Sequence, residues 1–120
     1  MVGILPITED DLDLEREQHV RLLLEQPDVL FNRHRFAIML ELYHVGGVDF
    51  SQLMHDLNLS EGALATHLKA LERDRLLNTK KESTGTRSRV ISHITKAGMV
   101  AVENMYAALS LAKDRVGMYE

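Results

Sequence analysis

The chain has 120 residues, which suits a single domain with its own core and leaves little room for a separate substrate domain. It has no cysteine, and this excludes disulfides, thiolate metal sites and a cysteine nucleophile. Its net charge of -4 argues against a nucleic-acid partner until the charge is followed along the chain.

The N-terminal quarter of the chain is strongly acidic. Residues 1–30 hold eight acidic and two basic side chains, a net charge of -6. The apolar opening at residues 1–7 lacks a cationic leader and is followed at once by acidic residues, unlike a secretory signal. No apolar run reaches membrane-spanning length. We therefore expect a soluble, cytoplasmic protein without a membrane partner.

A first helix is predicted over residues 9–26. Thr8 is a suitable N-cap, the carboxylates that follow favour the positive end of a helix dipole, and Pro27 makes continuation costly. The apolar stripe of this helix includes Leu12, Val20 and Leu23.

A second helix is predicted from Asn32, as its cap, through Tyr43, with Gly46 and Gly47 ending it. Its apolar residues fall into one face with a flank beside it. The face contains Phe36, Leu40 and Tyr43, and the flank contains Ile38 and Leu42.

Two short helices joined by a tight turn are predicted next, after a very short strand at residues 48–50. Ser51 is expected to cap the first of them, and Ser60 the second, which ends near Arg75. Asn58 suits the turn because asparagine tolerates positive φ better than any residue except glycine. The inward stripe of the second helix is predicted to be Leu64, Leu68 and Leu71.

A two-stranded hairpin follows over residues 78–95, where polar and apolar residues alternate around turn residues 83–88. Thr95 is then expected to cap a last helix that runs to about Met118. Its apolar residues Val102, Met105, Leu109, Ala112 and Val116 have the spacing of a coiled-coil seam. This seam could close the monomer's own core, but helices at both ends of a small domain more readily form a two-fold dimer. The predicted dimer interface is Leu12, Val20, Leu23, Val102, Met105, Leu109 and Val116.

Basic charge gathers on the helix-turn-helix and hairpin. Residues 60–96 hold eight basic and four acidic side chains, a net charge of +4. A helix fits the major groove of duplex DNA, and a basic wing can reach phosphates and the minor groove. The predicted contacts of the helix are Ser60, Glu61, Gly62, Ala63, Thr66, Lys69 and Arg73, and those of the wing are Lys80, Lys81, Arg87 and Arg89. The methyl groups of Ala63 and Thr66 are placed to touch thymine methyl groups, and no Arg or Asn is poised for a bidentate base contact.

Other kinds of site have little support in the sequence. The six histidines are spread over separate elements without a pair at metal-ligand spacing, so we expect no metal site. His67 is expected to be partly buried and, when protonated, to reach a phosphate. The methionines of the last helix could line an adaptable pocket, but ordinary packing explains them better, and no cofactor is expected. No catalytic grouping is present, so an enzyme is not expected. The sequence does not indicate whether a small-molecule effector exists or what it is.

Several motifs resemble those of winged-helix transcription regulators of the MarR and ArsR type. The resemblance covers about residues 31–110 and rests on residues 59–72, on the wing at 84–89 and on Ile94-Thr-Lys-Ala-Gly98. It implies a dimeric regulator that binds operator-like duplex DNA, with a recognition helix at 60–73 and a wing at 79–93. Two glycines usual in these families are replaced here, by Asn58 and Arg75.

Together these features predict a mostly α (α+β) fold: a winged helix-turn-helix with a two-stranded wing. One domain is expected over residues 1–120, with a DNA-binding core at 31–95 and flanking dimerisation helices at 9–26 and 96–118. The predicted function is that of a homodimeric transcription regulator that binds double-stranded DNA. The alternative is a winged helix that serves as a protein-interaction module, with the acidic first helix or the last helix as its docking surface.

Overall fold

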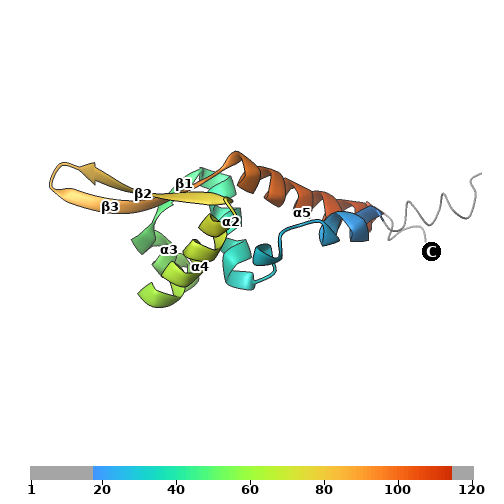
Figure 1. Cartoon of the computed structure of the whole chain (residues 1–120), viewed down its shortest axis with the longest axis horizontal. Coiled ribbons are helices and arrows are strands. Elements are labelled where there is room, and N and C mark those ends of the chain that lie inside the picture. The colour runs from blue at the N-terminus through green and yellow to red at the C-terminus, as the bar shows by residue number, and fades with distance from the viewer. Residues whose placement is uncertain (1–17, 115–120) are drawn as a thin grey trace, which may run out of the picture. The chain divides into compact units, whose positions relative to one another are not determined.

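The computed structural model describes residues 18–114. This part of the chain forms helices and a three-stranded antiparallel sheet whose last two strands make a hairpin wing (Figure 1). Residues 18–24 are helical. The elements that follow are η1 (Asp28–Leu30), α2 (Arg33–Val45), β1 (Gly47–Asp49), α3 (Phe50–Leu57), α4 (Glu61–Arg73), β2 (Leu77–Thr84), β3 (Arg87–Ile94) and α5 (Lys96–Asp114). The predicted mostly helical α+β winged-helix fold is confirmed.

The chain divides into two compact units. One is Pro27–Glu103, which contains every strand of the described chain, and the described parts of the other are residues 18–26 and 104–114. The expectation of a single domain over the whole chain stays a prediction. The parts of the predicted end helices at residues 9–17 and 115–118, with Leu12 and Val116, lie outside the described residues. Among the described residues, no helix is both long enough and apolar enough to cross a membrane.

The sheet has the strand order β1-β3-β2. In its register Val48 lies opposite Ser92, and Leu77 lies opposite Ile94, while Lys80, Glu82 and Thr84 of β2 follow outward along β3. Val48, Leu77 and Ser92 are buried at the inner end of the sheet. The outer half of the hairpin is exposed and projects beyond the helices of its unit (Figure 1). The sheet therefore anchors the wing at one end and presents it at the other.

The core lies between α2, α3, α4 and the sheet. Its fully buried large side chains include the predicted α4 residues Leu64 and Leu71, and Leu68 is only 5% exposed. Of the two apolar sets noted on α2, the face with Leu40 and Tyr43 is not the buried one, because these residues are 46% and 44% exposed. The residues of α2 that enter the core are Ile38, Met39 and Leu42. Both sets have helical spacing, so only the packing partners decide between them.

Helix ends follow local side-chain chemistry. Asn32 caps α2, its Oδ1 accepting from the backbone N–H groups of His34 and Arg35, as predicted. The cap of α3 is Asp49 rather than Ser51, because the Asp49 carboxylate accepts from the N–H of Gln52 at 2.7 Å. An N-cap side chain reaches the amide three residues on, and this spacing fixes the start of α3 at Phe50.

The start of α5 is tied to the end of α4. Thr95 Oγ1 donates to the backbone oxygen of Arg75 at 2.7 Å and accepts from the N–H of Gly98 at 3.0 Å, so Thr95 is the cap that was predicted. A Cβ on Gly98 would collide with the backbone oxygen of Leu76. The sequence therefore permits a close approach of α5 to the chain that follows α4.

Candidate nucleic-acid interface

The turn that enters α4 has the geometry of a helix-turn-helix. Asn58 ends α3 in the left-handed conformation, with φ 52° and ψ 48°, as predicted for this position. Ser60 then caps α4, its hydroxyl oxygen accepting from the N–H of Ala63 at 3.2 Å. The left-handed residue redirects the chain, and the serine starts a new helix two residues later.

The outward face of α4 holds the residues predicted to meet a major groove. Because Leu64, Leu68 and Leu71 point into the core, the other side of the helix is left at the surface. The exposed residues of the predicted set are Ser60, Glu61, Gly62, Thr66, Lys69 and Arg73, and Ala63 is half-buried. Apart from Glu61, the side chains of this set in the first two turns are small, and Lys69 and Arg73 add positive charge towards the end of the helix.

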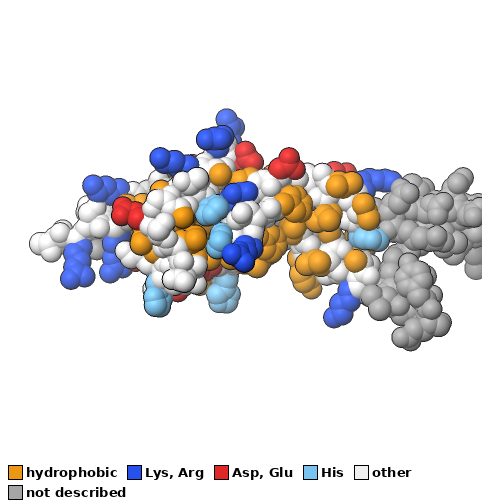
Figure 2. Space-filling model, turned by 90° about the horizontal axis from the view of Figure 1, so that it is seen from below, with side chains coloured by type: hydrophobic (Ala, Val, Ile, Leu, Met, Phe, Trp, Pro, Cys, Tyr) orange, Lys and Arg blue, Asp and Glu red, His pale blue; other side chains and the backbone are white. Residues whose placement is uncertain are grey.

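The wing brings three of its four predicted cations onto one face. Lys80 pairs with Ile91 and Glu82 with Arg89, and residues directly opposite each other, like those two apart on one strand, point to the same side of a sheet. Lys80, Arg87 and Arg89 therefore share a face, whereas Lys81 points to the other. All four are exposed, and Figure 2 shows Lys and Arg side chains around the wing at the left of the view. The turn that joins the strands contains Gly85 with φ 63°.

Sequence patterns did not indicate that the wing arginines lie beside the start of α3. An open groove of about 480 Å³ is lined by Asp49, Phe50 and Ser51 on one side and by residues 87–90 on the other. The pairing of Asp49 with Ile91 in the β1–β3 ladder brings these segments together. Asp49 and Ile91 are 42 residues apart in the chain, and a hydrophobic pattern contains no signal for such a pairing.

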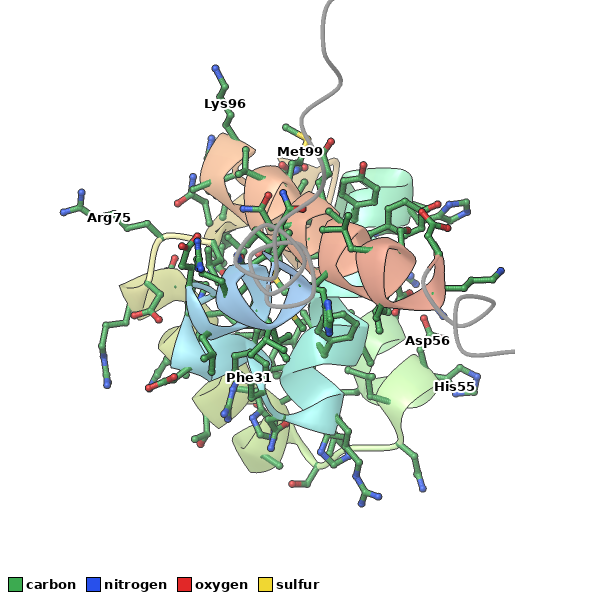
Figure 3. All side chains as sticks on the ribbon, turned by 90° about the vertical axis from the view of Figure 1, so that its right-hand side faces the viewer. Phe31, His55, Asp56, Arg75, Lys96 and Met99 are labelled. Atoms are coloured by element: carbon green, nitrogen blue, oxygen red, sulfur yellow. The ribbon has the colours of Figure 1, made fainter. Side chains whose placement is uncertain are left out.

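The turn after α4 also uses a left-handed residue. Arg75 has φ 61° at the position where winged-helix regulators of the MarR and ArsR type usually have glycine. Its side chain projects away from the neighbouring ribbon in Figure 3. The backbone geometry expected from that glycine is therefore retained here with arginine.

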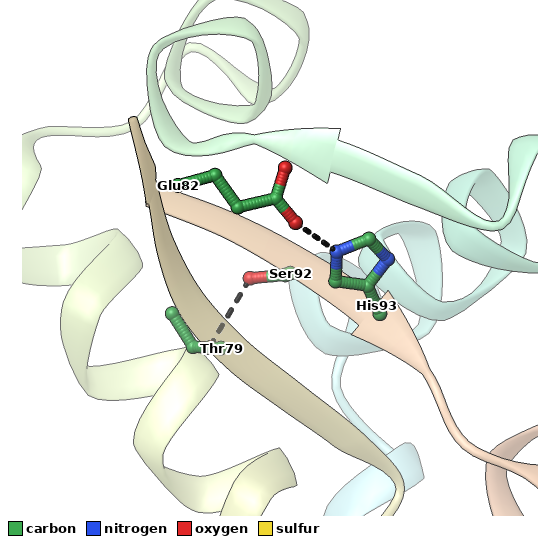
Figure 4. A network of polar contacts seen from close by, with 4 residues as sticks. All are labelled: Thr79, Glu82, Ser92 and His93. Carbon is green, nitrogen blue, oxygen red and sulfur yellow. Dashed lines mark hydrogen bonds and ion pairs between the residues drawn. The ribbon is translucent and has the colours of Figure 1, made fainter. Parts of the chain in front are cut away.

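Polar contacts fix the base of the wing (Figure 4). His93 Nε2 lies 3.1 Å from Glu82 Oε1, and the hydroxyls of Thr79 and Ser92 share a hydrogen bond at 3.3 Å. The carboxylate of Glu72 in α4 accepts from the N–H of Thr79 at 3.1 Å. These contacts join the two strands to each other and the end of α4 to the first of them.

The close packing of His93 also explains a glycine in β1. A Cβ on Gly47 would come within 2.7 Å of His93 Nδ1. The ring therefore lies directly over the backbone of β1, and a side chain at residue 47 would displace it. The inner end of the wing is held in place by this packing.

His67 is half-buried, as predicted, and its ring accepts a hydrogen bond from a side chain of α2. Its Nδ1 lies 3.3 Å from Arg35 Nη1, and because an arginine only donates, Nδ1 must be unprotonated. Burial lowers the pKa of His67, and the positive charges of Arg35 and His34 lower it further. Proton uptake by His67 is therefore disfavoured, which argues against the expected phosphate contact of a charged His67.

The predicted dimer residues differ in their accessibility. Val20, Leu23 and Leu109 are 46%, 37% and 67% exposed, and Met105 is half-buried. Val102 is only 4% exposed and packs in the core of the chain, and its assignment to the dimer interface stays a prediction. A coiled-coil spacing indicates which side of a helix is apolar, but it does not separate the core from the surface along that side.

No three His, Asp or Glu side chains within residues 18–114 come together in an arrangement that could hold a metal ion. The candidate functional surface is therefore the exposed face of α4 beside the cationic wing.

Comparisons with known proteins agree with this geometry. A winged helix DNA-binding domain family model matches residues 34–112. An uncharacterized protein of Methanocaldococcus jannaschii is 38% identical over 81 residues, which cover 67% of this chain and 88% of that protein.

Solved structures show the same fold. A transcriptional regulator homologue from Pyrococcus horikoshii OT3 superposes with a TM-score of 0.71 at 29% identity, covering 81% of this chain and 95% of that one. The MepR–DNA complex of S. aureus superposes with a TM-score of 0.66 over 92% of this chain and 85% of that one, at 16% identity, which shows the fold alone. The neighbours are regulators of the ArsR/HlyU and MarR groups, so the predicted resemblance is confirmed. The chain belongs to the winged-helix DNA-binding domain family, which is a family of regulators and not of enzymes.

Proposed function

We propose that the protein is a homodimeric transcription regulator that binds double-stranded DNA, with α4 in the major groove and the wing on the backbone and minor groove. The observation that carries the proposal is the exposed, Ser60-capped face of α4 beside three wing cations on one face of the hairpin. An α-helix fits the major groove, and arginines on a narrow hairpin fit the minor groove or bridge phosphates.

The proposed contacts divide into two kinds. Those of α4 are directed at base edges and nearby phosphates, and they are Ser60, Glu61, Gly62, Ala63, Thr66, Lys69 and Arg73. Those of the wing are directed at the backbone, and they are Lys80, Lys81, Arg87 and Arg89. Contacts to phosphate set affinity, whereas contacts to base edges set preference among sequences.

The homodimer is supported by exposed apolar side chains on the helical residues near both ends of the described chain. Val20, Leu23 and Leu109 are accessible, and Met105 is partly so. Removing apolar side chains of this size from water lowers the free energy. A second copy of the chain presents the same side chains, so the two copies can bury them against each other. Two copies would present two recognition helices to one duplex.

The experiment that tests the proposal compares Arg87→Ala with Lys113→Ala. Each variant removes one exposed positive charge, but only Arg87 lies in the proposed surface. Fluorescence anisotropy with a mixed-sequence duplex is expected to show weaker binding by Arg87→Ala and wild-type binding by Lys113→Ala. Equal affinity of Arg87→Ala and wild type would contradict the wing assignment. Failure of the wild type to bind any duplex at low salt would instead favour the protein-interaction module.

A further inference from the structure

Gly62 has no structural reason to be glycine within the protein. Gly46 and Gly85 have φ of 87° and 63°, and a Cβ on Gly47 or Gly98 would meet neighbouring atoms. Gly62 is the exception among the described glycines, because a Cβ built there meets nothing within 4 Å and its φ is not positive. Glycine in a helix costs stability relative to alanine. The absence of a side chain at residue 62 is therefore unexplained by the fold.

Thr66 lies one turn further along the same face of α4. Its hydroxyl donates to the backbone oxygen of Gly62 at 2.9 Å, although the side chain is exposed. The hydroxyl is therefore turned to the helix backbone, and the γ-methyl group is what this side chain leaves to face outward. Thr66 accordingly offers an apolar contact rather than a hydrogen bond.

The two residues together make a small notch. Side chains on a helix lean over the turn that precedes them, so Thr66 reaches over the position of Gly62, where no side chain occupies the space. The floor of the notch is the backbone of Gly62, and its wall is the Thr66 methyl group. The half-buried methyl group of Ala63 adds to its apolar character. The space left by one absent Cβ is about the size of a methyl group.

We propose that this notch receives the 5-methyl group of a thymine in the major groove, and that Gly62 and Thr66 thereby determine sequence preference. The thymine methyl is the apolar group that unmodified base pairs present in that groove. The proposal rests on the proposed function, because it places α4 against base edges. It explains both the missing side chain at residue 62 and the inward hydroxyl at residue 66.

The test uses a duplex recovered by selection from a random pool, prepared once with thymine and once with uracil in its place. Uracil lacks the methyl group and keeps every hydrogen-bonding atom, so base pairing and phosphate contacts remain. Removing one buried methyl group is expected to weaken binding about fourfold for each thymine that occupies a notch. The wild type should therefore bind the thymine duplex more tightly than the uracil duplex.

Thr66→Ser shows whether the effect arises at the notch. Serine keeps a hydroxyl that can bond to the Gly62 oxygen and removes only the methyl group. We expect this variant to bind the thymine duplex more weakly than wild type and to lose the thymine-to-uracil difference. Thr86→Ser deletes the same methyl group from the exposed wing turn, and the thymine-to-uracil ratio should stay that of the wild type.

Gly62→Ala fills the notch without disturbing the fold. Its melting temperature should rise by a few degrees, because alanine favours the helix and meets no neighbour. Its affinity for the thymine duplex should fall. A variant that is both more stable and weaker in binding separates a role in recognition from a role in folding.

The outcomes separate the inference from the function on which it depends. If the wild type binds the selected duplex equally well with thymine and uracil, the notch assignment is wrong while DNA binding stands. Retention of the thymine preference by Thr66→Ser would equally overturn it. If the wild type selects and binds no duplex, the proposed function fails and the inference falls with it.

Discussion

Asn58 and Arg75 hold the backbone at either end of the α4 region in the left-handed conformation, with φ of 52° and 61°. Both residues carry a Cβ that crowds the following carbonyl in this conformation, but the short polar side chain of asparagine can offset the cost by hydrogen bonding locally, whereas the long side chain of arginine does not. The turn after α4 therefore contains local strain that Asn58 avoids. The structure around Arg75, including the hydrogen bond from Thr95 to its backbone oxygen, keeps it in place.

We predict that Arg75→Gly stabilises the protein. Glycine removes the left-handed penalty, and its larger conformational entropy in the unfolded chain offsets part of the gain, so the free energy of unfolding should rise by about 0.5–1 kcal/mol. Urea denaturation measures this change. The control is Arg75→Ala, which removes the same side chain but keeps the Cβ and should show no gain. A destabilised Arg75→Gly would mean that the arginine side chain makes a stabilising contact.

The imidazole of His67 is predicted to make the stability of the protein depend on pH. Because burial and the charges of Arg35 and His34 lower its folded pKa, the folded state favours the neutral ring. This contribution to stability is present above the unfolded pKa, about 6.5, and is lost as pH falls through the folded pKa. Urea unfolding from pH 8 to pH 5 should show wild type losing more stability than His67→Gln. His44→Gln, at an exposed position, is the control and should follow wild type.

At the scale of elements, α2 and α3 meet through a pair of carboxyl groups. Burial, followed by the hydrogen bond with Asp56 and the charge of Asp56, raises the pKa of Glu41 to about 7. The pKa of Asp56 is lowered, first by its hydrogen bond with Glu41 and then by the bond that Gln52 donates. The two helices therefore share a proton between Glu41 and the Asp56 carboxylate.

We predict that Glu41→Gln removes this proton dependence. The raised pKa means that the contribution of Glu41 to stability is fully present below the ordinary glutamate pKa of 4.5 and is lost as pH rises through about 7. An amide donates to Asp56 at every pH, so Glu41→Gln should be more stable than wild type at pH 8, and the difference should shrink towards pH 5. Glu103→Gln is an exposed control. Parallel pH profiles for Glu41→Gln and wild type would contradict the shared proton.

Elements of this chain differ in how far the sequence predicts them. The caps at Asn32, Ser60 and Thr95 and the left-handed turn at Asn58 depend on local chemistry, and the sequence predicts them correctly. The inward face of α2 depends on which helices and strands surround it, and the periodic pattern alone does not decide which of its two apolar sets is buried. Local rules specify where most of these elements begin, although for α3 they indicate Ser51 and the cap is Asp49, whereas tertiary packing decides which side an element buries.

The candidate site shows the same division. The exposed face of α4 follows from its buried leucine stripe, and the alternation of the hairpin predicts a wing. Two features require the folded chain: the groove between the wing and the start of α3, which depends on pairing of β1 with β3, and the inward hydroxyl of Thr66. Neither feature produces a periodic pattern in the sequence from which it could be predicted.

At the scale of the whole molecule, the exposed apolar residues near the ends of the described chain predict self-association. Leu109→Glu places a charge in the proposed interface, where burial without a partner is costly. Sedimentation equilibrium should give twice the 13.6 kDa chain mass for wild type and the single mass for Leu109→Glu. Circular dichroism should be unchanged, because Leu109 is 67% exposed in the chain. A monomeric wild type would exclude the proposed dimer.

The uneven charge of the molecule leads to the central claim. A protein with a net charge of -4 binds DNA only if its cations are gathered on one surface. If each subunit of a dimer neutralises about four phosphates, binding releases counterions and log K should fall with log[salt] at a slope of about -7.

The most direct test is the salt dependence of duplex binding by wild type and Arg87→Ala/Arg89→Ala, measured by fluorescence anisotropy. Removing two cations from each subunit should weaken binding and reduce the slope to about -3.5, because about four fewer phosphates are neutralised per dimer. A wild type that binds with a steep slope, beside a variant with a shallow one, is the predicted result. Absence of wild-type binding at low salt, or identical slopes for the two proteins, would contradict the account.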